Sequence, residues 1–320
     1  MSRQRGAALL LAMLTVALVA TLASAALWRQ WRAIEVEGSE RARLQASWML
    51  SGALDWARLI LREDARSGAM DHLGEPWAVV LQESRVSSFL AMEGQDTSGT
   101  DAAFLSGGIS DAQSRMNITN LVAAGKLSEP DHLAFARLFE RLGLESAVLE
   151  RLTERWLLAA GVAADGTAEG AGKGAPLRPR HLEQLAWLGL NAETLRVLQP
   201  HVVLLPARTP LNLNTAGIDA IYSSVPGLEL AEARKFVEAR QRQPLRSLAE
   251  AQRRLPADVA ALAPGQFSVA SRFFEVRGRL RIDTTVVEEH SLLDRTGNGV
   301  FAVWRERVAP VGPVAPVPVR

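Results

Sequence analysis

An uncharged apolar run near the N-terminus, Ala7 to Leu27, constrains this chain more than any other feature of its sequence. A helix of this length rises about 30 Å, which matches the hydrocarbon core of a bilayer. Arg3 and Arg5 precede the run, and the pairs Trp28-Arg29 and Trp31-Arg32 follow it. Basic residues favour the cytoplasmic side and tryptophans favour the interface, so we predict one membrane-spanning helix with a cytoplasmic N-terminus.

Three interpretations of this run are open. A secretory signal peptide would be cut after Ala23-Ser24-Ala25, leaving a protein that begins at Ala26. A simple anchor would keep the intact N-terminus. A prepilin-type segment would be cut after Gly6 on the cytoplasmic side, and the mature protein would keep the apolar helix and begin at Ala7. Gly6 offers such a peptidase an unhindered backbone.

The residues after the run favour the prepilin-type interpretation. Residues 28–66 contain no proline, and their apolar side chains recur at three- and four-residue steps, which predicts an amphipathic stalk helix. The predicted stripe consists of Leu44, Trp48, Leu50, Leu54, Ile60 and Leu61, widened by Met49 and Trp56. A secretory signal has no reason to continue into a long helix, whereas a subunit that assembles through a stalk does.

This N-terminus resembles that of type IV pilins and type II secretion pseudopilins. Most members of that superfamily carry a glutamate at the fifth mature position, which is Leu11 here. Minor pseudopilins of the general secretion pathway protein K family typically lack this glutamate and are larger than their relatives, which suits a chain of 320 residues. The resemblance implies prepilin peptidase cleavage between Gly6 and Ala7, followed by N-methylation of Ala7.

Two internal segments carry the same resemblance. Arg115 to Asn120 is similar to a strand motif of the protein K family, although its second asparagine is displaced by one residue. Leu211 to Ala216, Pro226-Gly227-Leu228 and Pro244 to Leu248 are similar to a helix-hairpin-helix unit that these relatives share. We expect Asn212, Asn214 or Thr215 to cap the first helix of that unit, and Ser247 to cap the helix after it.

The hydrophobic period changes twice after the stalk. It is helical from about Asp131 to Leu262 and becomes two after Pro264-Gly265. The predicted fold is therefore α+β: a pilin-like long N-terminal helix and a small antiparallel sheet, interrupted by a large all-α insert with helix-hairpin-helix-like units. We predict a leader (1–6), a membrane helix (7–27), a stalk (28–66), a first pilin-like part (67–120), the insert (121–262), C-terminal strands (263–308) and a proline-rich tail (309–320).

The sequence predicts no catalytic or metal site. His72, His132, His181, His201 and His290 lie far apart, and the chain has no cysteine. Asp96, Asp101 and Asp111 lack the spacing of a calcium loop, so we expect solvated loop carboxylates. Relatives in the protein K family carry an acidic segment associated with Ca²⁺, but the linker 161–174 holds only Asp165 and Glu169 here. Two carboxylates are a poor cage for calcium, so no calcium site is predicted there.

A second hypothesis is a DNA-binding helix-hairpin-helix module. Arg234, Lys235, Arg240 and Arg242 could form its basic face. However, Glu229 occupies the place of the second turn glycine, where it would repel phosphate. The net charge of +1 also indicates an ordinary folded protein, so nucleic acid is not the expected partner.

The resemblance implies a structural subunit and not an enzyme. It implies a minor pseudopilin at the tip of the periplasmic pseudopilus of the type II secretion system, which exports folded proteins across the outer membrane. The implied partners are the minor pseudopilins I and J, the major pseudopilin and the prepilin peptidase. The implied location is the inner membrane, crossed once, with the bulk of the chain in the periplasm.

Overall fold

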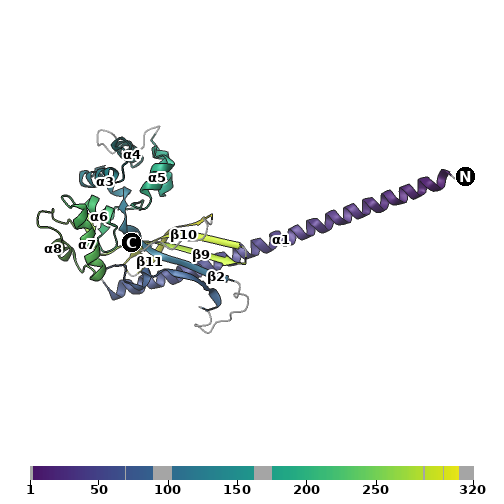
Figure 1. Cartoon of the computed structure of the whole chain (residues 1–320), viewed down its shortest axis with the longest axis horizontal. Helices are drawn as coiled ribbons and strands as arrows, with labels where there is room; N and C mark the ends of the chain where they lie inside the picture. The colour runs from purple at the N-terminus through teal and green to yellow at the C-terminus, as the bar shows by residue number, and fades with distance from the viewer. Residues whose placement is uncertain are drawn as a thin grey trace.

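The fold consists of a projecting helix, a sheet on which its second half packs, and a helical insert at the far end from the N-terminus (Figure 1). This computed structural model describes residues 3–68, 70–88, 103–161, 175–283, 285–297 and 299–309. The linker carboxylates Asp165 and Glu169, and the loop residues Asp96 and Asp101, lie outside the described residues.

One continuous helix, α1, runs from Arg3 to Ser67 and includes both the predicted membrane segment and the stalk. Its last turns pack on the sheet through Leu50, Leu54 and Leu61, each at most 8% exposed. Trp48 and Trp56 are 78% and 54% exposed, so the single apolar stripe predicted from sequence is wrong. Three- and four-residue steps alone do not separate two faces of a long helix, because each step is not a whole turn and the differences add up along the helix.

The sheet has five antiparallel strands in the order β1-β2-β9-β10-β11. The strands are β1 (Leu81–Arg85), β2 (Ala103–Asp111), β9 (Phe273–Ile282), β10 (Thr285–Thr296) and β11 (Gly299–Val308). The three C-terminal antiparallel strands confirm the sequence prediction. The sequence pattern does not predict strands β1 and β2. Strand β2 contains Ser106-Gly107-Gly108 in place of the β-branched residues that are typical of a strand.

A compact apolar core joins α1 to the sheet. The ring of Trp77, from the short 3₁₀ helix η1 (Pro76–Ala78), meets Phe274 edge to face with centroids 5.3 Å apart. The same buried cluster also contains Leu54 and Leu61 of α1, Leu293 of β10 and Val300 of β11. Because the helix lies across the sheet here, the residues of α1 before this region project beyond the sheet (Figure 1).

The insert is mainly helical but includes short strand pairs, so it is not all-α. Its helices are α3 (Glu129–Arg141), α4 (Ser146–Ala159), α5 (Ala192–Leu198), α6 (Ile218–Ser224), α7 (Leu230–Arg242) and α8 (Leu248–Arg254), with 3₁₀ turns η2 (Ala112–Ser114), η3 (Ile118–Leu121) and η4 (Leu182–Leu188). The pairs are β3 (Met116–Asn117) with β6 (Val202–Val203), β4 (Val122–Ala123) with β5 (Lys126–Leu127), and β7 (Leu211–Asn212) with β8 (Phe267–Ser268). One hydrophobic core extends from Met116 to Phe267.

The helix ends test the predicted caps. The hydroxyl of Ser247 accepts a hydrogen bond from the Glu250 N–H at 3.2 Å, which confirms the cap of α8. The predicted asparagine or threonine cap of α6 is wrong, because Gly217 occupies that position. Asn214 instead spans to Leu245, bonding its backbone N–H at 2.8 Å and its carbonyl at 2.9 Å.

Two adjacent glycines of β2 offer a test of this packing. A Cβ at Gly107 would overlap the carbonyl oxygen of Arg277 on β9, whereas a Cβ at Gly108 would lie 3.7 Å from Val80, an ordinary contact. We expect Gly107→Ala to lower the free energy of unfolding by about 2 kcal/mol or more, because backbone cannot yield as a side chain can. Denaturant unfolding of the purified chain measures the change. Gly108→Ala is the matched control and should change stability by less than about 1 kcal/mol; equal effects would contradict the clash.

Candidate functional site: the stalk and its junction with the insert

The residues predicted to be processed lie at the start of α1. Gly6 and Ala7 are within this helix, and Leu11 is 65% exposed. The helix contains an 18-residue window of mean hydropathy 2.3, none of it buried, so it is long and apolar enough to cross a membrane. This agrees with a single-pass anchor. Cleavage and methylation remain predictions.

A buried carboxylate, Asp111, joins the sheet to the insert. It ends β2 and accepts hydrogen bonds from Asn212 Nδ2 (2.9 Å), Thr215 Oγ1 (2.5 Å), Ser271 Oγ (2.6 Å) and the Gln113 N–H (2.7 Å). Burial raises the pKa of the Asp111 carboxyl, and the bonds from Ser271 and Thr215 oppose that rise. The prediction of a solvated loop carboxylate is therefore wrong at Asp111, which is 3% exposed.

A second cluster continues this network to the end of the stalk. Arg295 of β10 pairs with Asp64 of α1 at 2.8 Å and with both oxygens of Asp71 at 2.5 and 2.6 Å. Asp71 also accepts the Ser271 N–H at 2.6 Å. Since the Ser271 hydroxyl binds Asp111, Ser271 connects the two carboxylate clusters. The stalk, the sheet and the insert are thus linked through a few buried polar groups.

The carboxylates of Asp64, Asp71 and Glu75 lie close enough to share an ion, with ligand oxygens within 4.8 Å of one another. Burial and the neighbouring charges of Glu75 and Asp71 raise the pKa of Asp64 to about 6. The guanidinium of Arg295 already provides a positive charge at this place, and Glu75 accepts the indole N–H of Trp77 at 2.7 Å. We therefore interpret the trio as part of an ion-pair network.

The asparagines of the Arg115 to Asn120 motif hold the chain where it returns from the insert. Asn117 Nδ2 donates to the Ala207 carbonyl at 2.8 Å, and Asn120 bonds the backbone of Thr209 at 2.8 and 3.0 Å. Both side chains are buried. Their role is to satisfy backbone groups that would otherwise be buried without partners.

The helix-hairpin-helix unit is present, but its predicted basic face is incomplete. Helices α6 and α7 are joined by a turn in which Gly227 has a φ of 79°. Arg240 points inward and donates to the carbonyl oxygens of Leu213 and Ala216, and burial lowers its pKa to about 10. Its assignment to a DNA-binding face is therefore wrong. The buried guanidinium supplies donors to two backbone carbonyls of the Leu213 to Ala216 turn.

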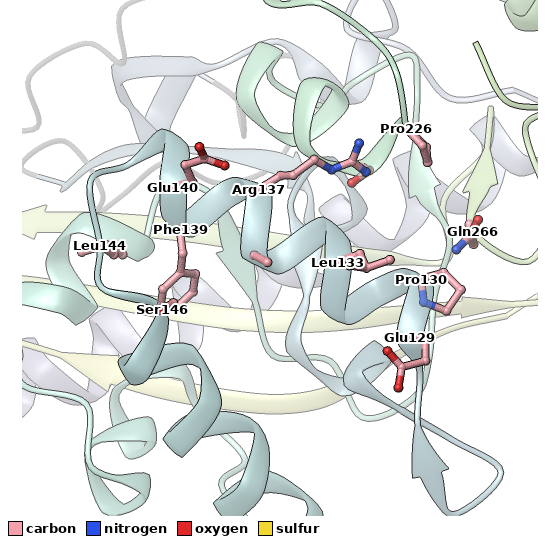
Figure 2. Close-up of a pocket in the computed structure, with 12 residues that line it drawn as sticks. Glu129, Pro130, Leu133, Arg137, Phe139, Glu140, Leu144, Ser146, Pro226 and Gln266 are labelled. Atoms are coloured by element: carbon pink, nitrogen blue, oxygen red, sulfur yellow. The ribbon is translucent and has the colours of Figure 1, made fainter. Parts of the chain in front are cut away.

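A surface pocket of about 800 Å³ runs along α3 (Figure 2). Its exposed apolar wall includes Leu133, with Glu129 and Glu140 towards its two ends. Arg137 lies between them and donates to the Val225 carbonyl at 3.2 Å, while burial lowers its pKa. The lining residues include no histidine, so this pocket lacks a serine–histidine pair.

Comparison with known proteins relates this architecture to secretion. Two family models, both described as type II secretion system protein K, match residues 114–207 and 211–270. The chain is 26% identical over 293 residues to type II secretion system protein K of Pseudomonas aeruginosa, covering 85% of this chain and 83% of that protein. It is 27% identical to the protein of the same description from Pectobacterium carotovorum subsp. carotovorum, covering 95% of this chain and 97% of the relative.

The fold also matches a solved structure. A chain of the crystal structure of the GspK-GspI-GspJ complex from the enterotoxigenic Escherichia coli type 2 secretion system superposes with a TM-score of 0.62 and 18% identity. The match covers 85% of this chain and 99% of that chain. Together with the family matches, this shared fold supports a minor pseudopilin of a type II secretion system. The family models and the relatives support assignment of this chain to the type II secretion system protein K family.

The buried junction can be tested at Asp111. Asp111→Asn keeps the shape but replaces one of the two acceptor oxygens with an NH₂ group. With the remaining oxygen accepting from Asn212, Thr215 and Ser271, the NH₂ group faces the Gln113 N–H, which loses its acceptor. We expect the free energy of unfolding to fall by about 2 kcal/mol, because a buried donor loses its acceptor. Chemical denaturation followed by tryptophan fluorescence measures this. Asp258→Asn, at an exposed position of the same insert, should have no such effect.

The raised pKa of Asp64 makes a separate prediction about pH. The folded carboxyl keeps its proton up to about pH 6, while the unfolded one loses it near its ordinary value of 3.8. Asp64 therefore favours folding at low pH, and this contribution is lost as the pH rises through about 6. The free energy of unfolding of Asp64→Asn minus that of the original chain should therefore increase between about pH 4 and pH 6 and stay constant above about pH 6.

Urea unfolding at several pH values measures this difference. Glu63→Gln is the matched control, because Glu63 is the adjacent carboxylate on α1 and its side chain is 70% exposed. Parallel pH profiles for the original chain and Asp64→Asn would contradict the raised pKa.

Proposed function

We propose that this chain is a structural, non-catalytic minor pseudopilin at the tip of the periplasmic pseudopilus, where it supports export of folded proteins across the outer membrane. The observation that carries this proposal is the 65-residue helix α1, whose first half is apolar and exposed while its end is fixed to a sheet and a bulky insert. The apolar first half of this helix is not covered by any other part of the chain that the structure describes. It needs a membrane before assembly and neighbouring helices afterwards.

The proposed partners are the minor pseudopilins I and J, with the major pseudopilin below them. Support comes from the solved complex, in which GspK is named together with GspI and GspJ. The identity to that chain is low, so this support concerns a shared fold, and the assembly of this chain is inferred by analogy.

Two features favour a terminal position. Leu11 stands where most pilin-like proteins carry the glutamate that engages a neighbouring N-terminal amine, and an unpaired carboxylate in hydrocarbon would be costly. The insert also sits at the end of the molecule opposite the N-terminus (Figure 1). There it would obstruct the stacking of another subunit in the direction away from the membrane.

The proposed orientation places the N-terminus in the cytoplasm and the sheet and insert in the periplasm, with the chain anchored in the inner membrane. The leader arginines and the interfacial tryptophans support it. The prepilin peptidase would then meet the Gly6–Ala7 bond on the cytoplasmic side.

Processing offers the decisive test. We expect the chain purified from a host that has a prepilin peptidase to begin at a methylated Ala7, as measured by mass spectrometry of the intact protein and its N-terminal peptide. Gly6→Val should abolish cleavage, because a β-branched side chain obstructs the scissile bond, while Arg5→Lys should be processed normally. A start at Ala26 would establish a signal peptide, and an intact Met1 would establish a simple anchor.

Export provides the functional readout. In a strain lacking its own protein K, the chain coproduced with its cognate secretion apparatus should restore secretion of an exported enzyme to the medium. Gly6→Val should fail to do so. Unimpaired secretion with unprocessed protein would contradict the proposed assembly.

A further inference from the structure

One face of α3 carries an ordered chemical pattern. Glu129, Leu133, Ala136 and Glu140 lie within about 60° of one another around the helix axis, at about 100° per residue. From the start of the helix to its end, this α3 stripe is acidic, apolar, small and acidic. The two glutamates are eleven residues apart in sequence, which places them about 16 Å apart along the axis.

The α3 stripe borders the surface pocket of about 800 Å³, a volume typical of ligand sites (Figure 2). Phe139 and Leu144 line this α3 pocket, and Pro226 lines it from the turn between α6 and α7. Leu133 is 60% exposed, although the surface lining the pocket is largely apolar. Single exposed leucines are ordinary on a protein surface, but a leucine in an apolar pocket is an uncovered contact surface.

The carboxylates of the α3 stripe have no cation of their own. Arg137 is the one basic side chain among the described residues that line the pocket, and it donates to the Val225 carbonyl at 3.2 Å. Arg141, the next arginine of α3, pairs with Asp219 at 3.0 Å. Within the part of the chain that the structure describes, neither Glu129 nor Glu140 forms an ion pair. A complementary occupant therefore brings positive charge to both ends of the pocket.

The spacing of the two carboxylates indicates the form of the occupant. An extended chain rises about 3.3 Å per residue, so about five residues cover the 16 Å between Glu129 and Glu140. An apolar side chain in the middle of such a segment would lie over Leu133 and Ala136. Nucleic acid and anionic lipid are disfavoured, because two carboxylates at the pocket ends repel phosphate.

We propose that the α3 pocket binds an extended segment of a partner polypeptide in which basic residues flank a short apolar stretch. Glu129 and Glu140 receive the two basic side chains, and Leu133 with Phe139 contacts the apolar stretch. The pocket belongs to the insert, at the end of the molecule far from the N-terminus (Figure 1). Its occupation is therefore separate from the assembly of the stalk.

The first experiment uses two fluorescein-labelled peptides and the full chain in a nonionic detergent. The arginine probe is Gly-Arg-Ala-Leu-Ala-Arg-Gly, and the glutamate probe replaces both arginines by glutamate. One exposed ion pair strengthens binding by at most about fivefold, so two pairs should favour the arginine probe by about tenfold. Fluorescence polarisation measures both dissociation constants. Equal affinity for the two probes would overturn the proposal.

Charge reversal tests the two glutamates directly. The double variant Glu129→Lys with Glu140→Lys should bind the glutamate probe better than the arginine probe. The matched control is Glu193→Lys with Glu238→Lys, since these glutamates are exposed on α5 and α7 and do not line the pocket. Far-UV circular dichroism and the melting temperature establish that both double variants are folded. An unchanged preference in the first variant, or a reversed preference in the control, would contradict the assigned carboxylates.

The apolar part of the pocket has its own test. Leu133→Gln should weaken binding of the arginine probe by about threefold at low salt and at high salt, because the lost contact is apolar. Its fold should be unaffected, since Leu133 is exposed and glutamine favours helix. Screening by salt should instead weaken binding to the original chain. Full affinity of Leu133→Gln would show that the peptide binds elsewhere.

Photocrosslinking in cells identifies the occupant. A photoreactive amino acid is placed at Leu133, and at Trp187 as a control, because Trp187 is 49% exposed and lies outside the pocket. Mass spectrometry should find, from Leu133 alone, a partner peptide with basic residues on both sides of an apolar stretch. Crosslinks to a second copy of this chain, to an acidic segment, or equally from both positions would overturn the proposal, as would the absence of any crosslink from Leu133.

Discussion

The position of the insert depends on one small group of buried polar contacts centred on Ser271. Its hydroxyl donates to Asp111 at the end of β2, and its backbone N–H donates to Asp71, which Arg295 also holds. Arg295 then reaches Asp64 in the last turns of α1. Buried polar networks are costly unless every member is satisfied, so this one permits few alternative arrangements. The stalk, the sheet and the insert are consequently joined by one connected set of contacts.

Much of the fold could be predicted from local patterns. The helical period predicts α3, and in the structure Gly143, with a φ of 69°, follows the end of this helix. Alternation marked β9, β10 and β11. Strand β2 could not be recognised, because its glycines are explained only by the close approach of β9. The sequence also does not distinguish the two faces of α1. Apolar residues at similar spacing pack against the sheet on one side of this helix and are exposed on the other side.

The sequence indicates the local features of the candidate site but not its long-range contacts. Leu11 and the Gly6–Ala7 bond are local features of the sequence, and the roles assigned to them stay predictions. The sequence predicts surface positions for Asp111 and Arg240, because charged residues are rarely buried and the partners of these two lie far away in sequence. Asn212, whose amide donates to Asp111, is the residue that could have indicated this buried network from the sequence. An asparagine within an apolar strand indicates a buried hydrogen bond.

The register of the sheet has an evolutionary consequence. Asp111 at the end of β2 pairs directly with Phe274 of β9, so everything between them is, in topological terms, one very long hairpin loop. The entropy of closing a loop grows only with the logarithm of its length. An ancestral protein with a tight turn at this point could therefore have acquired a whole second module without disturbing a single ladder bond. Descendants could enlarge, trim or exchange that module while keeping the same stalk and sheet.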